Sequence, residues 1–193
     1  MALPMEELRA RLGNTLSAHR YSHSLAVAEY GAQLAQLWKV DREQAYQAGL
    51  LHDMMHYLTA DEYLSWALIY GLRCDEAQLD DPQLLHGPLA AAVLAQDYSC
   101  RDEALLQAIR CHTLPEEEMC DLAKLIFLAD KLEPTRPAWP GQEELRQLAR
   151  RDLNACLAAC LRQTMDYLRE TGRAAHPDTG RLAKLYQDRA KLS

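Results

Sequence analysis

Polar residues stand directly after two apolar stretches that are typical of buried helices. The pair His52-Asp53 follows the apolar residues 48–51, and Asp130 follows residues 125–129, the most apolar helical stretch of the chain. Burying an imidazole beside a carboxylate costs free energy unless a partner satisfies both groups, and a divalent cation does this well. His52, Asp53 and Asp130 are therefore candidate metal ligands.

Two further histidines stand at the ends of expected helices. His86 follows two leucines at a helix start, and His112 closes a helix. Taken singly, each is typical of a polar residue at a helix end, and a histidine at a C-terminus is favoured by the helix dipole. Asp130 alone would be explained by an ion pair with Lys131 or Arg136. The repetition of this pattern within one small chain favours a shared metal site.

The elements that must hold these residues are helices. The 193 residues include 34 Leu and 29 Ala but only 3 Val and 3 Ile, a composition that favours helices and excludes a β-sandwich or barrel. Periodicity and capping residues predict helices at residues 5–16, 22–38, 42–53, 60–70, 101–112, 118–132 and 143–170, and others that begin near His86 and Asp178. We expect an all-α single domain, residues 1–193, with a core at about 15–136 and C-terminal helices at about 143–191.

The composition also limits the partners and the compartment. Because 21 Lys+Arg face 28 Asp+Glu, the net charge of -7 argues against duplex nucleic acid or an anionic membrane as a partner. The apolar runs fall far short of the ~20 residues that span a bilayer, and acids stand where a signal peptide has bases. The six cysteines form no CxxC pair, so we expect reduced thiols in a cytoplasmic protein.

The order His23, His52-Asp53, Asp130 resembles the H…HD…D signature of the HD-domain metallophosphohydrolases, an all-α superfamily. His86 and His112 resemble the additional histidines of its two-metal members. Six ordered strings, at residues 19–24, 48–53, 84–87, 112–113, 129–136 and 176–179, resemble more narrowly the bacterial YqeK family. This resemblance implies an HD-type helical bundle with a C-terminal helical extension. It also implies an enzyme that hydrolyses diadenosine tetraphosphate symmetrically to two ADP, usually with iron.

The resemblance further implies a ligand set and a mechanism. The metal ligands would be His23, His52, Asp53, His86, His112 and Asp130. Asp53 would bridge two metals, with His52 among the ligands of the first, and a hydroxide activated by the metals would attack phosphorus. His52 and Asp53 are the expected catalytic pair. Four imidazoles and two carboxylates suit two Fe ions, with Mn, Co or Zn as alternatives, and suit Ca poorly.

The same strings supply candidate contacts to the substrate, a dinucleoside polyphosphate or another nucleotide. These candidates are His19, Arg20, His56, Thr113, Lys131, Glu133 and Arg136. Arg136 could instead be a solvated loop residue, and Glu133 could orient a ligating histidine or cap a helix end. The chain departs from the family pattern at two positions. His56 stands where the family generally has Lys, and Pro115 stands where the family usually has Gly, within two residues after Thr113.

Other functions stay open at this stage. An HD phosphohydrolase of another nucleotide would share the metal set, and an HD oxygenase would consume O₂ instead. The departures at His56 and Pro115 also leave room for a non-catalytic, metal-containing module that binds a nucleotide. The oligomeric state, monomer or homodimer, is equally open.

Overall fold

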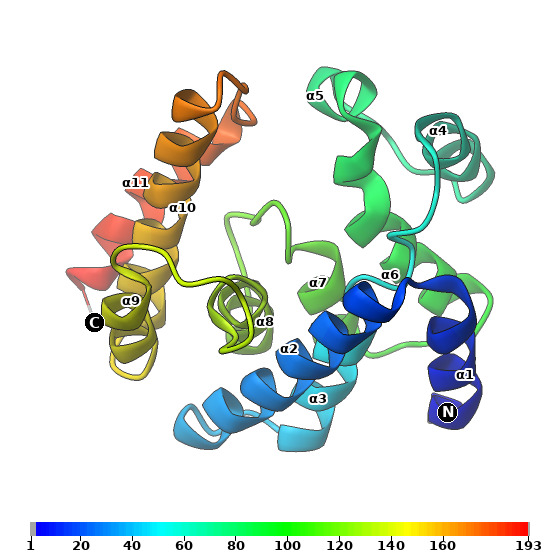
Figure 1. Cartoon of the computed structure of the whole chain (residues 1–193), viewed down its shortest axis with the longest axis horizontal. Coiled ribbons are helices and arrows are strands. Elements are labelled where there is room, and N and C mark those ends of the chain that lie inside the picture. The colour runs from blue at the N-terminus through cyan, green and yellow to red at the C-terminus, as the bar shows by residue number, and fades with distance from the viewer. Residues whose placement is uncertain (1–2, 193) are drawn as a thin grey trace.

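The computed structural model describes residues 3–192, whose regular structure is entirely helical (Figure 1). The α-helices are α1 Met5–Thr15, α2 Ala18–Leu37, α3 Arg42–Leu51, α4 Ala60–Ile69, α5 Glu76–Asp80, α6 His86–Gln96, α7 Glu103–Arg110, α8 Asp121–Leu132, α9 Gln142–Ala149, α10 Leu153–Glu170 and α11 Asp178–Ala190. A short 3-10 helix, η1, spans Pro82–Leu85. The all-α fold class expected from the composition is confirmed.

Helix α8 lies in the middle of the bundle. Residues 125–129 are fully buried, as their apolar sequence predicted. Helices α2, α3, α7 and α10 all pack against α8. Figure 1 shows α10 and α11 on one side of it, and α4 and α5 on the other side beyond α6 and α7. Residues at the ends of α3, α7 and α8 therefore meet in the interior of the fold.

Helices α2 and α3 approach each other closely at Gly49. A Cβ atom at this position would lie 2.7 Å from Ala28 Cα and 2.9 Å from Ala28 N, which is closer than side chains approach a neighbouring backbone. Only glycine therefore allows this contact without a shift of either helix. The contact fixes the last turn of α3, and with it the position of His52 three residues later.

The predicted starts of two helices are confirmed by their caps. Thr59 and Glu62 form a capping box at the start of α4, and Asp41 caps α3. Asp102 caps α7, which begins at Glu103, two residues after the expected start, and α2 begins at Ala18, four residues before it. Helix α3 ends at Leu51 instead of residue 53. Gly71, with a φ of 68°, follows the end of α4. Within residues 3–192, no helix is both long enough and apolar enough to cross a bilayer.

The single helix expected at residues 143–170 is wrong, because the structure has two helices there. Helix α9 ends at Ala149, and Asp152 begins α10 by accepting a hydrogen bond from Ala155 N at 2.9 Å. Helix α8 begins at Asp121 rather than near residue 118. The sequence did not predict α5 and η1, whose five and four residues are too short to show a period. The division into a core and a C-terminal extension stays a prediction.

Candidate metal centre

The structure brings all six expected metal ligands into one buried cluster. Their side chains are between 0 and 13% exposed. The members are His23 on α2, His52 and Asp53 after α3, His86 at the start of α6, His112 after α7 and Asp130 on α8. Residues as far as 107 positions apart thus meet because five helices end or cross at one place.

The cluster has two overlapping parts. His23, His52 and Asp130 present donor atoms within 4.8 Å of one another, and we call them the Asp130 trio. His52, Asp53 and His112 meet the same distance and form the Asp53 trio. His52 is thus common to both trios by distance, whereas the sequence-based expectation gave the bridging position to Asp53.

Asp53 nevertheless directs its two oxygens at different partners. Its Oδ1 atom lies 3.3 Å from His86 Nε2 and 3.7 Å from His112 Nε2. Its Oδ2 atom lies 3.4 Å from His52 Nε2 and 2.8 Å from Arg20 Nη1. A bridging carboxylate needs this division of its oxygens between two sets of partners.

The histidines of the cluster are held through their Nδ1 atoms. In His52, His86 and His112, Nδ1 donates to the backbone carbonyl three residues earlier, at 2.5 to 2.7 Å. His23 Nδ1 lies 3.1 Å from Glu133 Oε1. Because carbonyl oxygens only accept, the contacts of His52, His86 and His112 put a proton on Nδ1, so that in the neutral ring the Nε2 lone pair faces the cluster. This is the tautomer, and the outer contact, that metal-ligating histidines use.

Some of these lone pairs find no protein partner. His52 Nε2 is buried and has no hydrogen-bond partner within residues 3–192. His86 Nε2 and His112 Nε2 lie 2.7 Å apart, so two neutral rings would set lone pair against lone pair. The Thr113 hydroxyl lies within 3.1 Å of both atoms, yet it has one proton and can donate to only one. A divalent cation satisfies all of these atoms, so the donor set fits a metal.

Both aspartates of the cluster are ionised at neutral pH. Burial alone would raise the pKa of the Asp53 carboxyl, but the surrounding imidazoles, His52 foremost, hold that pKa well below its usual range. Burial likewise opposes ionisation of Asp130, but the hydrogen bond from His23 and the nearby cationic side chains hold its pKa well below the usual range. Two fixed negative charges therefore stand among the imidazoles, an arrangement that attracts cations.

Three of the expected phosphate contacts lie against these carboxylates. Arg20 Nη1 lies 2.8 Å from Asp53 Oδ2, Arg136 Nη2 lies 2.6 Å from Asp130 Oδ1, and Lys131 Nζ lies 3.5 Å from Asp130 Oδ2. Arg136 also donates to the backbone carbonyl of Asp130, so it is not a solvated loop residue. The three cationic side chains stay 23 to 36% exposed, which leaves each a face that an anion can approach.

His56 lies beside the cluster, but no continuous helix connects it to His52. Helix α3 ends at Leu51, and turns follow. The His56 ring lies 4.9 Å from the His86 ring, and the Gln83 amide donates to its Nε2 at 3.1 Å. Burial lowers the pKa of His56. At neutral pH it is therefore a hydrogen-bonding group and not the cation that Lys supplies in the family pattern.

The last two candidates, Glu133 and His19, differ in burial. Glu133 is 1% exposed and accepts from Thr135 N at 2.5 Å and from the Thr135 hydroxyl at 2.7 Å, behind His23. Its position is that of a residue that orients a histidine. His19 is exposed and contacts no ligand of the cluster within the described part of the chain.

Sequence reasoning missed the groups that support the ligands. Thr135 fixes Glu133, and Gln83 supplies a backbone carbonyl to His86 and an amide to His56. A backbone carbonyl leaves no mark in a sequence, because every residue has one. Thr135 has a weak sequence signal, because it stands two residues after Glu133, a candidate site residue.

Comparison with known proteins agrees with this geometry. The HD domain family matches residues 20–135, which contain the whole cluster. The "Bis(5'-nucleosyl)-tetraphosphatase, symmetrical" of Bacillus subtilis is 34% identical over 175 residues, 90% of this chain and 92% of that protein. The protein of the same name from Halalkalibacterium halodurans is 34% identical over 164 residues, 85% of this chain and 87% of that protein.

A solved structure extends the likeness to three dimensions. It is the crystal structure of a "predicted HD superfamily hydrolase involved in NAD metabolism" from Clostridium acetobutylicum. The two structures match with a TM-score of 0.91 at 29% identity, over 98% of this chain and all of the other. The family match and the His/Asp cluster together identify a divalent-metal site. The chain belongs to the HD-domain family and, within it, to the family of the symmetrical bis(5'-nucleosyl)-tetraphosphatases.

Proposed function

We propose that this protein hydrolyses diadenosine tetraphosphate, or a closely related dinucleoside tetraphosphate, symmetrically. Water adds across the central P–O–P bridge, so that one ADP receives the oxygen of water and the other keeps the bridging oxygen. The observation that carries this proposal is the convergence of four imidazoles and two ionised carboxylates in a chain that matches enzymes of this name over most of its length.

We propose two divalent transition metals, iron first and Mn, Co or Zn as alternatives, as the resident cofactor. The support is the two overlapping donor trios and the mixed nitrogen and oxygen donors, which are of intermediate hardness. A metal of this kind supplies Lewis-acid chemistry, because it makes water nucleophilic at neutral pH and stabilises charge on the phosphoryl group. His23, His52 and Asp130 would hold one metal, and Asp53, His86 and His112 the other.

The side chains of the cluster act by binding and orientation. Their hydrogen bonds through Nδ1 fix each imidazole, so the donor atoms are in place before a ligand arrives. His52 and Asp53 stand at the junction of the two trios and are the proposed catalytic pair. Because ADP is a good leaving group, the reaction has little need of a strong general acid.

We propose that the cations next to the carboxylates bind the polyphosphate. Arg20 and Arg136 each present a guanidinium that already contacts a ligating carboxylate, and Lys131 stands beside Asp130. A polyphosphate can replace part of these ion pairs, since the exposed face of each cation can bind a phosphate oxygen. Thr113 contacts the ligating histidines directly. His56 would contribute a hydrogen bond, and His19 would act only at the outer edge of the site.

The free thiols of the protein fit the cytoplasm that we propose as its location. All six cysteines are unpaired, and four of them are buried. Thiols persist in the reducing cytoplasm.

A product assay tests the proposed activity. The protein is purified without oxygen, its metal content is measured, and it is given diadenosine tetraphosphate in water enriched in ¹⁸O. We expect ADP as the sole nucleotide product, with one labelled oxygen for every two ADP. ATP together with AMP would show asymmetric cleavage. Binding without turnover in a metal-loaded preparation would show a nucleotide-binding module, and either result overturns the proposal.

A further inference from the structure

Two pockets have walls that contain residues of the metal cluster or their neighbours along the chain. The first, the α10 pocket, has a volume of about 370 Å³ and is lined by Asp130, Lys131, Arg136, Trp139, Gln163 and Tyr167, among others. The second, the α5 pocket, has a volume of about 430 Å³ and has leucines 72, 84, 85, 114 and 182 in its wall. Both volumes lie within the range of about 300–1,000 Å³ that is usual for small-molecule sites.

The α10 pocket contains a metal ligand and two aromatic rings. Asp130 of the Asp130 trio lies in its wall, so the pocket is continuous with the cluster. Trp139 and Tyr167 line the same pocket, and neither has a partner ring within residues 3–192. The Tyr167 side chain is 52% exposed, and the Gln163 amide makes no hydrogen bond in the described structure. Unpaired rings beside an amide are suited to a nucleobase, which stacks on a ring and has donors and acceptors on its edge.

The wall of the α5 pocket contains chain neighbours of the other half of the cluster. Leu84 comes two residues before His86, and Leu114 directly follows Thr113, whose hydroxyl contacts both His86 and His112. Leu84 and Leu114 are half-buried and belong neither to the core nor to the side chains packed against it. Apolar side chains that line a pocket without packing partners are suited to a flat apolar ligand.

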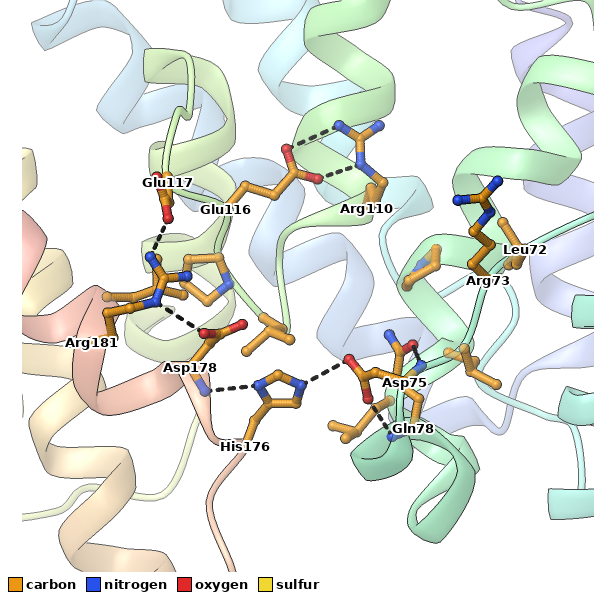
Figure 2. A pocket seen from close by; sticks show the side chains of 16 residues that line it. Leu72, Arg73, Asp75, Gln78, Arg110, Glu116, Glu117, His176, Asp178 and Arg181 are labelled. Carbon is orange, nitrogen blue, oxygen red and sulfur yellow. Dashed lines mark hydrogen bonds and ion pairs between the residues drawn. The ribbon is translucent and has the colours of Figure 1, made fainter.

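Polar groups form the rim of the α5 pocket (Figure 2). His176, two residues before α11, faces Asp75, the N-cap of α5, and the His176 Nε2 and Asp75 Oδ2 atoms lie 3.0 Å apart. Gln78 lies next to Asp75 and donates to it from its backbone nitrogen. Arg73 makes no ion pair within residues 3–192. An apolar wall with a polar rim on two sides fits a nucleoside, whose base is flat and whose ribose carries hydroxyls.

We propose that the α10 pocket and the α5 pocket each bind one nucleoside of the same dinucleoside tetraphosphate, with the phosphate chain running across the metal cluster between them. This inference rests on the proposed function and adds to it a reason why the cleavage is symmetrical. Two different pockets hold the two identical ends of the ligand. The central P–O–P bridge is equidistant from both nucleosides, so anchoring both ends presents that bridge to the cluster.

A series of shortened ligands tests this arrangement. Adenosine 5'-tetraphosphate has one nucleoside and inorganic tetraphosphate has none, and both are measured as competitors of diadenosine tetraphosphate hydrolysis. The variants are Tyr167→Ala in the α10 pocket, Leu84→Ala with Leu114→Ala in the α5 pocket, and all three together. Tyr167→Phe, which keeps the ring, serves as the conservative variant. Leu68→Ala, at a residue 82% exposed on α4 and outside both pockets, is the matched control.

Each pocket variant should raise the KM for diadenosine tetraphosphate by about five-fold or more, the usual effect of losing the contacts of one base. None should change the inhibition constant of inorganic tetraphosphate. Adenosine 5'-tetraphosphate fills one pocket at a time, so only one of the two single-pocket variants should weaken it strongly. Tyr167→Phe should stay near the parent.

Two results would overturn the inference while leaving the proposed function intact. One is a parent enzyme that releases ADP while both pocket variants behave like Leu68→Ala. The other is a set of variants that weaken inorganic tetraphosphate as much as the dinucleotide, which would place their effect in the cluster. A parent enzyme that does not hydrolyse diadenosine tetraphosphate would instead refute the proposed function itself.

Discussion

His86 and His112 bring their Nε2 atoms to within 2.7 Å of each other, although each ring donates from Nδ1 to a backbone carbonyl. Neutral imidazoles in this tautomer repel each other at this distance, because both Nε2 atoms carry lone pairs. The carbonyls hold the rings in place, so the fold maintains an arrangement that favours a cation. The pair lies next to Asp53 and supports the proposed second metal site.

The proposed second metal site can be tested separately from the first. His86→Ala takes away one donor beside Asp53 but leaves the Asp130 trio unchanged. We expect metal content to fall from two ions toward one per chain. Turnover should fall by about 100-fold or more, because loss of an outer contact alone costs about 10- to 100-fold. Elemental analysis and steady-state kinetics on one preparation measure both. Two bound ions in the variant would exclude His86 as a ligand.

Glu133 should control metal affinity through His23. Glu133→Gln keeps the size of the side chain and an oxygen for Thr135, but it removes the negative charge from behind the imidazole. We expect the affinity for the metal to fall by about 10- to 100-fold, measured by competition with a chelator. Glu143→Gln, on the surface of α9 beside Arg146, is the control and should have no effect. Equal affinities in the two variants would contradict the role of Glu133.

Gly49 should be essential for the packing of α2 against α3. Gly49→Ala sets a methyl group 2.7 Å from Ala28 Cα, so the helices must move apart. We expect the free energy of unfolding to fall by about 1–3 kcal/mol, measured by urea denaturation. Gly13→Ala in α1 meets no atom within 4 Å and should instead stabilise the protein by about 0.5–1 kcal/mol. If both variants gained stability, the close contact at Gly49 would not exist.

The ion pair between Arg110 and Glu116 ties the end of α7 to the loop that follows His112, and it should make stability depend on pH. Burial opposes ionisation of Glu116, but hydrogen bonds from Arg110 and Gln107 outweigh it and lower the pKa of this carboxyl below 4.5. A lowered pKa contributes stability above the unfolded value, and the contribution is lost as pH falls through the folded value.

Glu116→Gln should therefore destabilise the protein at pH 7 and lose this effect below about pH 4. The Glu116 side chain is 41% exposed, so water screens the pair and the effect at pH 7 should stay within about 1 kcal/mol. Urea denaturation at both pH values measures it. A difference that persists at low pH would show that the carboxylate charge is not responsible.

The sequence indicated which residues would lie together in the cluster, because their chemistry is local. Burying a polar pair after an apolar stretch, as at His52-Asp53, costs free energy without a partner, and such a pair can be recognised in the sequence. It did not predict the break before Asp152, since continuous apolar periodicity conceals a cap within a helix. The close contact at Gly49 and the two pockets depend on the distance between helices, which no single segment contains.

The measurement that tests the central claim most directly is metal content together with turnover in Asp53→Ala. Asp53 contacts both the His86–His112 pair and His52, so its loss should disturb both metal positions while the helices remain. We predict that the variant keeps the helical circular dichroism of the parent, binds less than one metal per chain, and no longer releases ADP from diadenosine tetraphosphate. A variant that hydrolyses this substrate at the parent's rate would contradict the account.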